Sequence, residues 1–97
     1  MAETIDELSI EWTDDDGTVT LKQTDKQVLT KGSWTTIMYR YQDWDRQKEV
    51  YGPEKATIRR YRKRNGRYSE QSKFNISSAK QARRMVEILS GWFPPED

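Results

Sequence analysis

Apolar and polar side chains alternate in several short stretches of this chain, a pattern typical of β-strands with one buried face. Residues 8–12 and 18–22 are the first two such stretches. They flank the sequence TDDDG, in which Gly17 can adopt the positive φ that a tight turn requires. We therefore expect an N-terminal hairpin at about residues 7–23. Residues 25–31 show no clear period, and this segment is expected to be either a short strand or a loop.

A second region of strands follows. Residues 33–42 are rich in Thr, Ile, Tyr and Trp, which favour a pleated sheet. Large side chains occupy both alternating faces of this segment, which indicates that both faces are covered. After a polar segment that ends in a Gly-Pro turn signal, two further strands are predicted, ATIRRYRK and RYSEQSKFNI. The dipeptide Asn65-Gly66 lies between them and is typical of a hairpin turn.

The last periodic segment predicts an amphipathic helix, because five apolar side chains recur at helical spacing: Ala82, Met85, Val86, Leu89 and Trp92. Ser77 or Ser78 can cap this helix, Gly91 can terminate it, and two prolines follow. We expect an α+β fold, an antiparallel sheet of four or more strands with this C-terminal helix lying across one face. Trp92 would then belong to the core.

Length and composition restrict what such a domain can do. The 97 residues fit one domain, with the basic hairpin and the helix at about residues 56–93. Only 33% of the residues are hydrophobic, so the core must be thin, which favours a dimer. The chain has no Cys and no His, which excludes disulfides, histidine catalysis and the usual zinc ligands. We expect no catalytic residue, no metal and no cofactor, and hence no enzyme.

Two further sequence features concern ligands and location. Asp14, Asp15 and Asp16 do not fit a calcium loop, because Trp12 occupies the first ligand position, so we interpret them as a hairpin turn. No apolar run approaches the roughly 18 residues of a membrane helix. The acidic N-terminus, MAETIDELS, has no apolar centre and is not a signal peptide. We expect a cytoplasmic protein without a membrane partner.

The net charge of +1 conceals a strong segregation of charge. Residues 1–16 contain seven acidic and no basic side chains, whereas residues 56–75 contain seven basic side chains and only one acid, Glu70. Such asymmetry favours a polyanionic partner. Tyrosines among the arginines can stack on unpaired bases, which favours single-stranded nucleic acid. Two simpler interpretations remain open: the charges protect sheet edges, or the acidic N-terminus neutralises the basic face.

Four short motifs between residues 58 and 89 occur in the order Ile58-Arg59-Arg60-Tyr61, Arg64-Asn65-Gly66, Phe74-Asn75-Ile76 and Ser77 before the helix. This third of the chain resembles the C-terminal half of the transcriptional positive-cofactor-four family of single-stranded DNA binders. That resemblance implies a curved four-stranded antiparallel sheet plus a helix, dimerisation through the helices, and a basic, aromatic sheet surface that grips single strands. The Pur-alpha repeat and the plant Whirly domain are similar in layout and ligand. The chain departs from the family pattern at Arg62, where an aromatic residue is expected, and in its longer N-terminal half.

The resemblance implies DNA contacts for Arg59, Tyr61 and Lys73. The remaining candidates come from the basic hairpin, the preceding strand and a polar segment: Lys63, Arg67, Arg40, Trp34 and Trp44. We therefore predict a single-stranded nucleic-acid-binding protein, with single-stranded DNA as ligand, acting in transcription or DNA maintenance. It would be a homodimer through the C-terminal helix. The alternative is a protein–protein interaction module whose basic hairpin docks an acidic partner.

Overall fold

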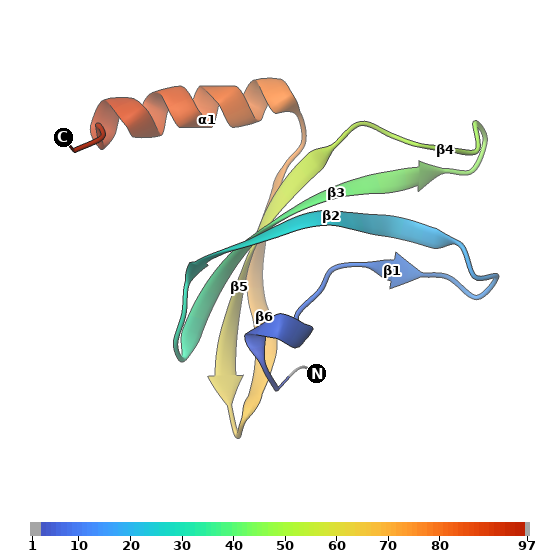
Figure 1. The fold of residues 1–97 in the computed structure, drawn as a ribbon, viewed down its shortest axis with the longest axis horizontal. Coiled ribbons are helices and arrows are strands. Elements are labelled where there is room, and N and C mark those ends of the chain that lie inside the picture. Colours follow the sequence, from blue (N-terminus) through green and yellow to red (C-terminus); the bar gives the residue numbers. More distant parts are fainter. Residues whose placement is uncertain (1–2, 97) are drawn as a thin grey trace.

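The computed structural model describes residues 3–96. Within them the chain forms a short 3₁₀ helix, six strands and one α-helix: η1 (Ile5–Glu7), β1 (Trp12–Thr13), β2 (Val19–Thr30), β3 (Trp34–Asp45), β4 (Val50–Tyr51), β5 (Lys55–Arg64), β6 (Arg67–Ile76) and α1 (Ala79–Trp92). The strands pair in the antiparallel order β1-β2-β3-β5-β6, with β4 beside β3. Figure 1 shows the sheet strongly twisted and curled. The structure thus confirms the α+β class.

The predicted hairpins form, but their extents differ from the prediction. The Asn65-Gly66 turn joins β5 to β6 with φ values of 51° and 78°, as expected for this dipeptide. The undecided segment 25–31 lies largely in β2, which runs to Thr30. The predicted strand at residues 8–12 is mostly irregular. Its Ile10 amide donates to the side chain of Gln23 at 3.1 Å, in place of a backbone ladder bond.

One face of the sheet, here called the covered face, carries the core. Its buried cluster is Leu8, Ile37, Tyr39, Tyr61 and Tyr68, and the partly buried Ile5, Ile10 and Val28 pack against it. The cover is the N-terminal segment, because Ile5, Leu8 and Ile10 all come from it. The Lys26 ammonium fixes this segment by donating to the carbonyls of Ile5 and of Leu8, the latter at 2.8 Å.

The helix does not lie across the sheet, which corrects the prediction. Ser78 caps it as expected, accepting a bond from the Gln81 amide at 3.1 Å. From there α1 leads away from the strands (Figure 1), and none of its residues is buried. Trp92 is 71% exposed and is not a core residue. Gly91 lies inside the helix, which ends one residue later. The aromatic core under the N-terminal segment therefore forms without the helix.

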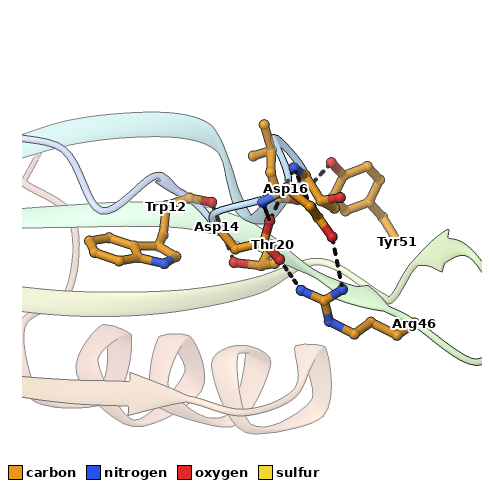
Figure 2. A network of polar contacts seen from close by, with 8 residues as sticks. Trp12, Asp14, Asp16, Thr20, Arg46 and Tyr51 are labelled. Carbon is orange, nitrogen blue, oxygen red and sulfur yellow. Dashed lines mark hydrogen bonds and ion pairs between the residues drawn. The ribbon is translucent and has the colours of Figure 1, made fainter.

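The acidic turn is held by hydrogen bonds and by an arginine from a different loop (Figure 2). The Asp14 carboxylate accepts bonds from the amides of Asp16 and Thr18, which stabilises the turn. Arg46 pairs with Asp14 and lies 3.6 Å from the Asp16 carboxylate. The structure thus confirms the hairpin turn, with a guanidinium as counter-ion. Within residues 3–96 no group of three His, Cys, Asp or Glu side chains could hold a metal ion.

Searching residues 3–96 for a membrane-spanning helix finds none that is sufficiently long and apolar.

Two core tyrosines give the protein a predictable response to alkali. The hydroxyls of Tyr39 and Tyr61 are 3.0 Å apart, and burial raises the pKa of both above the ordinary value of 10.0. Above about pH 10 the unfolded chain releases protons that the folded protein keeps, so the free energy of unfolding falls as pH rises. Below about pH 10 the contribution of the two tyrosines to the free energy of unfolding should not change with pH. Above it, we expect the free energy of unfolding to fall by up to about 1.4 kcal/mol per pH unit for each tyrosine.

Urea unfolding between about pH 8 and about pH 11 measures this loss. Tyr39→Phe removes one of the two groups, so its stability should depend less steeply on pH than that of the wild type. An equal slope in both proteins would show that Tyr39 does not contribute.

Candidate nucleic-acid interface

The face of the sheet opposite the core, here called the open face, brings Trp34 together with two arginines. The register of β3 on β5 places Trp34 opposite Arg62 and Thr36 opposite Arg60. Side chains alternate along a strand, so Arg60 and Arg62 point away from the buried Tyr61 between them. This part of the open face stays accessible, since Trp34 is 37% exposed and Arg60 is exposed.

The geometry of this cluster is that of a cation–π contact. The guanidinium carbon of Arg60 lies 4.2 Å from the centroid of the Trp34 ring, and that of Arg62 lies 5.1 Å from it. Both distances are within the range in which the ring quadrupole attracts a cation. The contact fixes a flat indole beside two planar guanidiniums. Both kinds of group stack on unpaired nucleic-acid bases.

Most cations of the basic hairpin have no ion-pair partner within residues 3–96: Arg60, Arg62, Lys63, Arg64, Arg67 and Lys73. The acidic N-terminal segment does not neutralise them. In residues 3–16, ion pairs are made by Asp14 and Asp16, and both go to Arg46 at the other end of the sheet. At the β5–β6 turn, Arg64 and Arg67 line a shallow hollow with Asn65 and Ser69. The basic charge is therefore available to an external anion.

The predicted residues Trp34 and Arg67 lie at this turn-proximal end of the sheet. Arg67 pairs in register with Arg64 at the hairpin turn. Lys63 and Lys73 are also on the basic hairpin but belong to the covered face, because they stand opposite Tyr68 and Arg59 in the β5–β6 register. Both lysines are exposed, and the Lys63 ammonium lies 5.2 Å from the Tyr68 ring centroid. Neither lysine therefore lies on the same face as the Trp34 indole.

The structure does not support the predicted contacts of Arg59 and Tyr61. The Arg59 guanidinium pairs with Glu70 at 2.7 Å, and the side chain is only 16% exposed. Tyr61 is 5% exposed under the N-terminal segment, and its hydroxyl bonds to that of Tyr39. Tyr61 therefore cannot stack on a base in this conformation. The reason is alternation: both side chains fall on the covered face of β5.

Arg40 and Trp44 are not part of the cluster either. Arg40 is six residues from Trp34 on β3, which corresponds to about 20 Å, and it pairs with Glu54 at 3.2 Å. Trp44 lies farther along the same strand. It is not in a polar loop, as predicted, but packs edge-on against Tyr51 with ring centroids 4.9 Å apart. Both side chains therefore have structural contacts on the part of β3 that lies beyond Trp34 and the basic turn.

Sequence reasoning missed Arg60 and Arg62 as site residues. Their alternation with Tyr61 already places them on the face opposite that tyrosine. What was missing is the pairing of β3 with β5, which sets them against Trp34. The prediction that both faces of β3 are covered is also wrong at this end of the strand, where Trp34 is accessible.

Comparison with models of known protein families, with curated protein sequences and with solved structures gave no match for this chain.

Proposed function

We propose that this protein binds single-stranded nucleic acid, with single-stranded DNA as the first candidate, through the turn-proximal part of the open face. The observation that carries the proposal is the Trp34 indole held beside Arg60 and Arg62, among arginines without ion-pair partners in residues 3–96. In this proposal the protein is a cytoplasmic binding protein and not an enzyme. The role in transcription or DNA maintenance belongs to the same proposal, and the likeness of residues 58–89 to the positive-cofactor-four family supports it.

In the proposed mechanism, one group of side chains binds phosphates and another stacks on bases. Arg62, Arg64 and Arg67 bind phosphates and release counter-ions, which gives affinity without sequence preference. A base that has left its stack packs on the Trp34 indole or on the Arg60 guanidinium that lies against it. A duplex hides the faces of its bases within the stack, so it can use only the phosphate contacts. The same surface should therefore bind single strands more tightly than duplexes.

Titration of labelled oligomers tests this proposal. We expect dT and rU oligomers to bind more tightly than a duplex of the same length at each of two salt concentrations. If these three arginines each bind one phosphate, log K should fall against log salt concentration with a slope of about −2 for single strands. Equal affinity for duplex and single strand would reduce the surface to a generic basic patch. Failure to bind either ligand would favour the protein–protein alternative.

We propose further that the protein is a homodimer through α1. The supporting observation is the set of exposed apolar side chains on this helix: Val86 at 63%, Leu89 at 48%, Trp92 at 71% and Phe93 at 74% exposure. In addition, Met85, Ile88, Leu89 and Trp92 line an apolar hollow. A contiguous apolar surface of this kind on a small domain is typical of a protein interface. A second copy presents the same surface, as a twofold dimer requires.

Substitution on this surface should dissociate the dimer. We expect the wild-type protein to sediment as a dimer at micromolar concentration and Leu89→Glu to sediment as a monomer, because each dimer would bury two unpaired carboxylates. Lys80→Glu is the matched control, since it lies on the opposite side of the same helix by spacing and should leave the dimer intact. A wild-type protein that stays monomeric at this concentration would contradict the proposed dimer.

A further inference from the structure

The apolar stripe of α1 changes in side-chain size from one end of the helix to the other. It begins with two small residues, Ala79 and Ala82, and ends with two large ones, Leu89 and Trp92. Met85 and Val86 lie at the middle. The stripe is symmetric about the midpoint between Met85 and Val86. Ala79 and Trp92 are equally far from this midpoint, and so are Ala82 and Leu89.

The small end of the stripe borders a hollow. A space of about 190 Å³ lies where the helix leaves the sheet, and its lining includes Ala56, Ile76, Ala79 and Ala82. The rest of its lining is polar, with Ser78 and the ion pair of Arg40 with Glu54, and with Lys55, which pairs with Asp43. The large residues of the same helix cannot fill it, because Trp92 is about 20 Å from Ala79 along the axis. Trp92 itself is exposed, so the chain carries both an unfilled apolar hollow and a large apolar side chain that nothing in residues 3–96 covers.

We propose that two copies pair their α1 helices antiparallel, about a twofold axis between Met85 and Val86, so that Trp92 of each copy fills the hollow beside Ala79 and Ala82 of the other. This inference rests on the dimer proposed above and specifies its geometry. In this register Ala82 faces Leu89 of the second copy, and Met85 faces Val86. The two alanines then meet large side chains and the two middle residues meet each other, which gives the close packing that protein interiors require.

A parallel pair would not achieve this packing. Ala79 and Ala82 would face their own equivalents and leave a void, whereas Trp92 would meet Trp92. Voids and overpacking both destabilise an interface.

Engineered disulfides test the register, because the natural chain has no cysteine. In the proposed pair, residues 82 and 89 of different copies lie side by side, whereas residue 82 of one copy is about 10 Å along the axis from residue 82 of the other. A disulfide requires Cα atoms within about 7 Å. The double variant Ala82→Cys/Leu89→Cys should therefore form a covalent dimer on mild oxidation. Each single variant, Ala82→Cys or Leu89→Cys, should not.

Sedimentation of the same reduced samples separates the outcomes. Neither position is buried, so all variants should fold. Covalent dimers of Ala82→Cys alone would overturn the antiparallel register while leaving the proposed dimer standing. A dimer by sedimentation that gives no disulfide in the double variant would also overturn the register. A monomer in all samples would overturn both the register and the dimer, whereas single-strand binding is judged by the oligomer titration alone.

Discussion

Trp34→Ala is expected to weaken binding of single-stranded oligomers by about 1–3 kcal/mol, which is roughly a 5- to 150-fold decrease in affinity. The indole is the only aromatic ring among residues 3–96 that has two guanidiniums over it, so its removal takes away both a stacking surface and the group that orders Arg60 and Arg62. Stacking releases few ions, so the slope of log K against log salt concentration should change little. Titration of a labelled dT oligomer at several salt concentrations measures both quantities.

Two comparisons make this prediction specific. Trp44→Ala is the matched control, because it removes the same side chain from the same strand at the end that packs on Tyr51, and it should bind nearly as well as the wild type. The double variant Arg60→Ala/Arg62→Ala should instead make the salt slope shallower, by about 0.7 for each phosphate that these arginines bind in the wild type. If Trp34→Ala and Trp44→Ala bind equally, the open face near the basic turn is not the site.

Tyr61→Ala is expected to lower the free energy of unfolding by about 3–5 kcal/mol, the cost of removing a large aromatic side chain from a core. Tyr61 is 5% exposed, belongs to the main buried cluster and shares a hydrogen bond with Tyr39. A domain of this size has only about 5–15 kcal/mol of stability, so a large part of the chains should be unfolded at moderate temperature. Thermal melting followed by circular dichroism measures the destabilisation.

The conservative variant Tyr61→Phe keeps the ring and removes only the hydroxyl. We expect its free energy of unfolding to fall by about 1 kcal/mol, the net value of one hydrogen bond, and its affinity for oligomers to match that of the wild type. This pair of variants distinguishes a core tyrosine from a stacking tyrosine. A Tyr61→Ala protein that melts like the wild type but binds weakly would show that Tyr61 contacts the ligand, contrary to its position under the N-terminal segment.

The features that the sequence determined are local ones. The Asn65-Gly66 turn follows from the ease with which these two residues adopt positive φ, and the structure has both there. The Ser78 cap follows from a side chain that can accept a bond from an amide three residues ahead. The alternation along β3 likewise placed Ile37, Tyr39 and Tyr41 on one buried face. Each of these depends on residues that are close together in the chain.

Only the tertiary structure decided which face of the sheet is covered and by what. The N-terminal segment takes the place predicted for α1, because Leu8 fits among the tyrosines and Lys26 binds its carbonyl from β2, 18 residues farther along the chain. The pairing of β3 with β5 made Arg60 and Arg62 partners of Trp34 and put Tyr61 in the core. The alternation of side chains indicates which residues of a strand lie on the same face of the sheet. Which face is buried depends on contacts between distant segments, and these carry no periodic signal in the sequence.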